Sequence, residues 1–183
     1  MKKSILIAAM LFVGAFAMPA HAETGLVTLL INGNGQNNGF SVALSPDGRE
    51  YLVTSTLTLE VGGDTCTHPG NAPDELECKA PAIAAFEIST FGGDDRVTLS
   101  GDVPVPATIR GGPGNDRLLG GAGADKIAGG TGEDFLSGGK GDDWLFGGPG
   151  SDRLLGGPGA DQLHGGPGED KLVGGPGENA LVQ

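Results

Sequence analysis

The chain has 183 residues, 36 of them glycine, and a formal net charge of −12 at pH 7. This acidity argues against nucleic acid or an anionic membrane as a partner, and it suits a chain whose charge is balanced by bound metal. Beyond the first 22 residues no long segment has the periodicity of an amphipathic helix, so the pattern predicts an all-β protein.

Residues 1–22 have the pattern of a signal peptide. Lys2 and Lys3 precede an apolar run at 5–17, and alanines flank His21 just before the expected cleavage site. The run is too short to span a bilayer, and no cysteine near the cleavage site offers a lipid anchor. We therefore expect a secreted protein, extracellular or periplasmic, without a membrane anchor.

Residues 23–90 contain fewer glycines and more valine, threonine and leucine than the segment that follows. Apolar runs separated by turn-forming residues predict short strands. The predicted strands are 26–31, 40–44, 51–61 and 83–90. We expect this β-rich lead-in to cap or extend the repeats that follow, because the end of a stacked structure must be covered. A separate small β-sandwich is the alternative.

Cys66 and Cys78 are the only cysteines. In an exported chain they are expected to form a disulfide around a loop that holds Pro69 and Pro73. Closing a loop of this size contributes about 3 kcal/mol in the chain-entropy interpretation. Catalytic thiol chemistry is disfavoured because the sequence contains no C-x-x-C motif.

Residues 91–110 join the lead-in to a repetitive region and begin with a degenerate copy of its repeat. Within 91–97, Asp95 takes the sixth position of the repeat and Val97 takes the eighth. Asp95 is therefore an additional candidate metal ligand.

From Gly111 one nine-residue phrase is repeated eight times without an insertion. Each copy has glycine at positions one, two and four and an aliphatic residue at position eight. Position six is occupied by Asp116, Asp125, Asp134, Asp143, Asp152, Asp161 and Asp170, with Asn179 in the last copy. A flexible glycine-rich linker has no reason to keep an aliphatic residue at one position, so the period indicates a stacked architecture.

The clustered glycines predict a tight turn, and the last three residues of each copy predict a very short strand with its middle side chain inward. Two copies then make one flattened coil of 18 residues with a turn at each end. Stacking places the position-six residues in two columns. The first holds Asp116, Asp134, Asp152 and Asp170, and the second holds Asp125, Asp143, Asp161 and Asn179.

These columns are expected to need a cation. Neighbouring coils lie about 4.8 Å apart, as strands do, and two carboxylates at that distance repel by about 3 kcal/mol at an effective dielectric constant of about 20. Oxygen ligands in a flexible turn suit Ca²⁺ better than Mg²⁺, which demands near-ideal octahedral geometry. We therefore predict a segment that is disordered without calcium and folds when calcium binds.

The phrase GGxGxDxUx, with U an aliphatic residue, is matched from Gly111 onward and resembles the RTX (haemolysin-type) calcium-binding repeat. The resemblance implies a right-handed parallel β-roll, a β-solenoid of nonapeptide repeats, over 111–183. It also implies several Ca²⁺ ions held between the turns of copies i and i+2, by position-six aspartates and turn carbonyls. Asn179 departs from this pattern.

The sequence shows no H-E-x-x-H zinc motif, no G-x-S-x-G elbow and no P-loop, which favours a non-enzymatic protein. The favoured function is a secreted calcium-binding protein. The alternative is an adhesion module in which calcium is scaffolding and an aromatic patch of Phe135, Trp144 and Phe146 binds a surface or a glycan. An active site within 23–90 and self-association are further hypotheses.

Overall fold

The computed structural model describes residues 4–6, 9–11, 27–56, 58–60, 66–67, 69, 72–79 and 83–183. The predicted signal peptide lies largely outside these residues, except for strands β1 (Ser4–Leu6) and β2 (Ala9–Leu11). All elements of the described residues are strands, and no helix long and apolar enough to cross a membrane occurs among them. The prediction of an all-β fold is confirmed.

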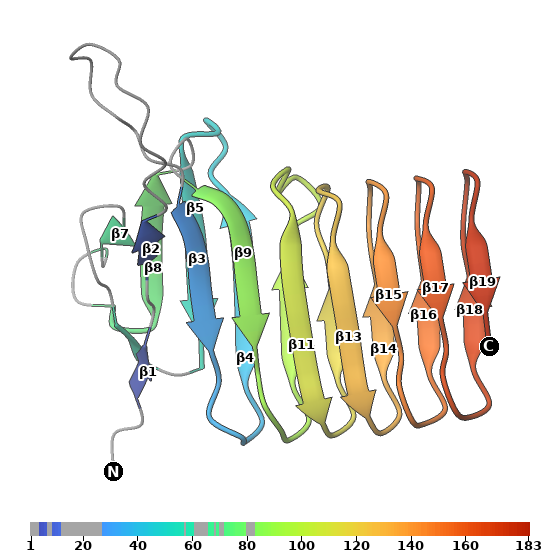
Figure 1. Cartoon of the computed structure of the whole chain (residues 1–183). Coiled ribbons are helices and arrows are strands. Elements are labelled where there is room, and N and C mark those ends of the chain that lie inside the picture. Colours follow the sequence, from blue (N-terminus) through green and yellow to red (C-terminus); the bar gives the residue numbers. More distant parts are fainter. Residues whose placement is uncertain are drawn as a thin grey trace.

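Two sheets face each other along the length of the molecule, with the N-terminal region at one end and the last repeat at the other (Figure 1). One sheet has nine strands in the order β18-β16-β14-β12-β10-β4-β5-β8-β7. These strands are β4 (Gly39–Leu44), β5 (Glu50–Ser55), β7 (Cys66–Thr67), β8 (Glu75–Lys79), β10 (Arg96–Leu99), β12 (Arg117–Leu119), β14 (Phe135–Ser137), β16 (Arg153–Leu155) and β18 (Lys171–Val173).

The other sheet has eight strands in the order β19-β17-β15-β13-β11-β9-β3-β2. In addition to β2 these are β3 (Val27–Asn32), β9 (Ile83–Ser89), β11 (Ala107–Pro113), β13 (Lys126–Thr131), β15 (Trp144–Phe146), β17 (Gln162–His164) and β19 (Ala180–Val182). A separate pair joins β1 to β6 (Thr58–Glu60).

The repeats pair in parallel with one constant register. Leu118 of β12 lies opposite Leu136 of β14, and Ile127 of β13 lies opposite Leu145 of β15. Consecutive copies therefore belong to opposite sheets, and each coil contains two copies. The predicted parallel β-roll is confirmed.

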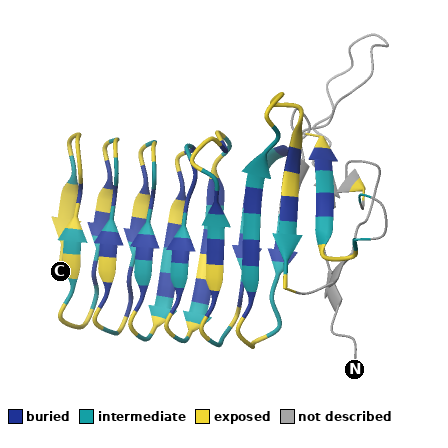
Figure 2. Cartoon of the chain, turned by 180° about the vertical axis from the view of Figure 1, so that it is seen from behind, coloured by how far each residue is buried: buried dark blue, intermediate teal, exposed yellow. Residues whose placement is uncertain are grey.

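The aliphatic residue at position eight of each copy fills the space between the sheets. The first six of these side chains are at most 1% exposed, whereas Leu172 is partly buried and Leu181 is 51% exposed. Position eight is predicted to point inward in every copy, but Leu181 lies in the last coil, which no further coil of the described chain covers. Figure 2 shows the change from buried to exposed residues along the roll.

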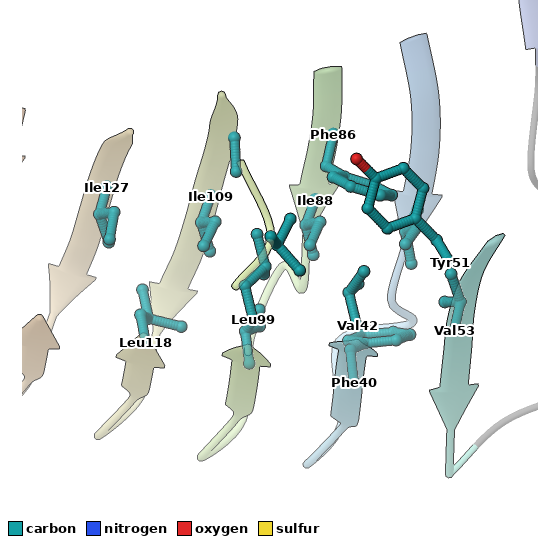
Figure 3. Close-up of a cluster of buried hydrophobic side chains, with 14 of the residues drawn as sticks. Phe40, Val42, Tyr51, Val53, Phe86, Ile88, Leu99, Ile109, Leu118 and Ile127 are labelled. Carbon is teal, nitrogen blue, oxygen red and sulfur yellow. The ribbon is translucent and has the colours of Figure 1, made fainter. Parts of the chain in front are cut away.

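The lead-in strands continue both sheets of the roll. Strands β10 and β4 pair in parallel in one sheet, and β11, β9 and β3 pair in parallel in the other. Beyond β4, strands β5 and β8 are antiparallel. Side chains of the lead-in, such as Tyr51 and Phe86, belong to the same buried cluster as Leu118 and Ile127 (Figure 3). The lead-in therefore continues both the sheets and the buried cluster of the roll.

Candidate metal sites in the glycine–aspartate turns

The position-six residues line the two edges of the roll in two columns. Each lies at the end of a glycine turn, directly before a short strand of its copy. Asp95 extends the first column toward the lead-in, because its backbone N–H donates to Asp116 at 2.8 Å. Six of the seven repeat aspartates and Asp95 are at most 3% exposed, and Asp170 is half-buried.

One carboxylate oxygen of each aspartate is used to join neighbouring coils. The backbone N–H of Asp116 donates to Oδ1 of Asp134 at 2.7 Å, and that of Asp134 donates to Oδ1 of Asp152 at 2.8 Å. The second column repeats this ladder from Asp125 to Asp143 at 2.8 Å and onward to Asp161 at 2.9 Å. In each of these bonds the carboxylate of one coil accepts a backbone N–H of the coil before it.

The second oxygen, Oδ2, has no hydrogen-bond partner in most of these aspartates although it is buried. This holds for Asp95, Asp116, Asp134, Asp143, Asp152, Asp161 and Asp170. Asp125 is the exception, because its Oδ2 accepts the backbone N–H of Gly121 at 2.8 Å. Buried charged oxygens without a partner are strongly unfavourable, so each unpartnered Oδ2 indicates a place for a positive charge.

The first glycine of a repeat borders the space in front of this oxygen. A Cβ added at Gly147 would meet Oδ2 of Asp152 and would lie 2.6 Å from the carbonyl oxygen of Gly165. Gly147 does not have a positive φ, whereas Gly148 and Gly150 have φ of 113° and 157°. In this copy, positions two and four thus require glycine for their backbone angles, and position one requires it because any side chain would fill an oxygen-lined space.

Burial makes the carboxylates resist ionisation when no cation is near. Desolvation, with additional repulsion from aspartates in the same column, raises the pKa of Asp116 and of Asp143 to about 7. Burial also raises the pKa of Asp134 to about 6, against the lowering effect of a backbone hydrogen bond. A cation placed against Oδ2 reverses this effect, because opposite charge favours the ionised form.

The donor set restricts the kind of cation. In the part of the chain that the structure describes, no three or more His, Cys, Asp or Glu side chains are grouped as a metal site. An ion in these turns would take carboxylate oxygens from the columns and its remaining ligands from backbone carbonyls such as that of Gly165. An all-oxygen set in a turn fits Ca²⁺.

These features define a parallel β-solenoid with oxygen-lined turns along both edges. Residues 108–136, 120–154, 128–163 and 146–181 match four copies of the RTX calcium-binding nonapeptide repeat. The chain therefore carries RTX calcium-binding repeats over residues 108–181, as the sequence resemblance indicated. Neither the curated proteins nor the solved structures yielded a match to the chain.

The predicted aromatic patch is only partly correct. Trp144 is 46% exposed and its ring stacks on Phe146 with centroids 6.5 Å apart, both on β15. Phe135 lies on β14 in the other sheet, where the Arg117 guanidinium carbon is 4.2 Å from its ring centroid. The third ring of this group belongs to His164, whose centroid is 5.2 Å from that of Phe146 and which was not among the predicted patch residues.

Proposed function

We propose that the protein is a secreted, non-catalytic calcium-binding protein whose RTX region folds when its turns bind Ca²⁺. The observation that carries this proposal is the set of buried aspartate Oδ2 atoms without partners. The proposed ligands include Asp95, Asp116, Asp134, Asp143, Asp152, Asp161 and Asp170, together with turn carbonyl oxygens. Asp125 belongs to the second column, but both of its carboxylate oxygens accept backbone N–H groups.

The chain's own residues would do three things at each site. The Oδ1 ladder holds the carboxylate in place, the glycine at position one leaves space, and carbonyl oxygens such as that of Gly165 complete the oxygen lining. When bound, calcium supplies the positive charge that offsets the repulsion within a column. Folding and binding are thereby linked, since the unfolded chain has no such arrangement of oxygens.

A circular dichroism titration tests the proposal. Adding calcium to the chelated mature chain should raise its β-structure content with a midpoint of about 10⁻⁴–10⁻³ M, the range of extracellular calcium modules. Magnesium at equal concentration is the control and should produce little change, because Mg²⁺ demands near-ideal octahedral geometry and gives up its waters reluctantly. Full β-structure in excess chelator, or an equal response to magnesium, would contradict the proposal.

Export and a disulfide between Cys66 and Cys78 are part of the proposal. The two cysteines are direct register partners in antiparallel strands β7 and β8. Residues directly opposite in such a pair have Cα atoms about 4.5–5.5 Å apart, which suits a disulfide. The mass of the exported protein should therefore increase by about 2 Da on reduction, and its N-terminus should be Glu23. An unchanged mass would refute the disulfide.

Binding of a glycan at the Trp144 face is the second candidate function. A groove of about 460 Å³ runs beside Trp144 and is also lined by Lys126, Asp142 and Gln162. An exposed indole supplies a stacking surface, and the neighbouring polar groups can bond to hydroxyls. Trp144→Ala should abolish binding to a glycan array while the calcium titration remains unchanged; retained binding would contradict this candidate.

A further inference from the structure

The turn of the second repeat differs from the other repeat turns in how its aspartate is satisfied. Oδ1 of Asp125 accepts the backbone N–H of Ala107 at 2.7 Å. Oδ2 of the same carboxylate accepts the backbone N–H of Gly121 at 2.8 Å. Both oxygens of Asp125 therefore have protein donors, whereas the aspartates of copies one and three to seven each keep an unpartnered Oδ2.

The backbone of this turn explains the difference. In every other copy, the glycines at positions two and four have φ between 95° and 157°. Gly121 and Gly123 do not have positive φ. Changing these angles rotates the peptide groups, and the Gly121 N–H comes to point at the carboxylate of its own turn.

The segment before the first repeat accounts for the different backbone angles of the second turn. The N–H of Ala122 donates to the carbonyl of Val103 at 2.7 Å, and a Cβ at Gly121 would lie 2.7 Å from the same carbonyl oxygen. In later coils the equivalent turn packs against another glycine turn, as a Cβ at Gly139 would meet the carbonyl oxygen of Gly121. The second turn therefore packs on 100–106, which does not have the repeat sequence.

In the last repeat the protein also satisfies the polar groups of the turn itself, here through Asn179 in place of an aspartate. Asn179 Oδ1 accepts the backbone N–H of Asp161 at 2.9 Å, so it continues the ladder of the second column. Its Nδ2 donates to the carbonyl of Gly175 at 2.8 Å and to that of Gly177 at 3.3 Å. An amide N–H thus satisfies turn carbonyl oxygens that would otherwise be available to a cation.

We infer that the second and eighth turns are closed by the protein's own N–H groups, and that neither Asp125 nor Asn179 binds calcium. This inference rests on the proposed function and assigns the ions to the turns whose aspartate Oδ2 has no donor. It removes Asp125 from the ligands that the sequence implied. The second turn is tied by Ala107 and Val103 to the capped end, so the second column begins at a turn that is closed without calcium.

Asp125→Asn and Asp143→Asn form a matched pair, since the two aspartates are neighbours in one column. The number of calcium ions per mature chain is measured by isothermal titration at saturating calcium. Asp143→Asn should lose at least one ion, and Asp125→Asn should keep the wild-type number. An equal loss in both variants would overturn the inference while leaving the proposed function intact. A wild-type chain that binds no calcium would refute the proposed function itself.

Asp125→Asn places an amide N–H against the Gly121 N–H and is expected to unfold at a lower temperature, with or without calcium. If this variant does not fold, hydrogen exchange of the wild-type mature chain tests the inference in its place. The Gly121 amide should be protected in chelator, whereas the Gly139 and Gly148 amides, which bond to the following coil, should gain protection only with calcium. Calcium-dependent protection of Gly121 would overturn the inference.

Discussion

Replacing Gly147 with alanine tests whether the first glycine of a repeat is required by an ion site. Because Gly147 lacks a positive φ, its backbone accepts alanine, and such a change commonly stabilises a protein by about 0.4–1 kcal/mol. Here the new Cβ would lie 2.6 Å from the Gly165 carbonyl oxygen and against Oδ2 of Asp152. We expect the opposite sign, with loss of one ion.

The magnitude follows from linkage. A site with a dissociation constant of about 10⁻⁴–10⁻³ M contributes about 1.4–2.7 kcal/mol to stability at about 10 mM calcium. Steric crowding destabilises the variant both with and without calcium. For each protein, the unfolding free energy in chelator is therefore subtracted from that in calcium. The loss of the ion is the amount by which this difference is smaller in the variant than in the wild type. Urea denaturation followed by circular dichroism measures both.

Gly101→Ala is the matched control, because a Cβ at Gly101 has no atom within 4 Å and Gly101 also lacks a positive φ. It should keep the wild-type ion count and the wild-type gain in stability from calcium, with a stabilisation of at most about 0.4–1 kcal/mol that is equal with and without calcium. A Gly147→Ala variant that binds as many ions as the wild type and gains the same stability from calcium would refute an ion site beside Gly147.

Three further predictions concern the core, protons and metal removal. In calcium, Leu136→Ala should lower the unfolding free energy by about 2.7–5 kcal/mol by urea denaturation, and Leu181→Ala, at a 51% exposed site, by far less; equal losses would contradict the packing. The raised pKa of Asp116 and Asp143, about 7 in the folded chain against 3.8 ordinarily, means that the metal-free fold binds more protons than the unfolded chain between these values. In chelator its stability should therefore be greatest at low pH and fall as the pH rises through 7, and a flat profile of ellipticity would count against this. Chelation at pH 8 should shift the fluorescence of Trp144, the only tryptophan, to longer wavelength as its coil opens, and an unchanged spectrum would argue against calcium-dependent folding.

The repetitive part of the fold was predictable because its information is local and periodic. Glycines at fixed positions require turns, one aliphatic residue per copy requires an inward side chain, and the nine-residue period makes equivalent residues stack. From these three facts the sequence predicted stacked coils and the two aspartate columns, and the resemblance to RTX repeats implied the parallel roll. Asp95 was predicted only as a candidate ligand, and the structure places it in the first column. Strands of the lead-in were also predicted, but the long one at 51–61 contains two strands, β5 and β6.

The hydrogen bonding of individual turns and the grouping of the aromatic residues depend on contacts between segments that are distant in sequence. Asp125 matches the repeat as well as Asp143 does, and only the packing of its turn on Val103 supplies the donor that satisfies its Oδ2. Phe135 and Trp144 are close in sequence but lie on opposite sheets, because consecutive copies alternate between the sheets. The repeat sequence determines the local conformation of each copy. Its burial, its exposure and its hydrogen-bond partners depend instead on the segment that the tertiary structure places beside that copy.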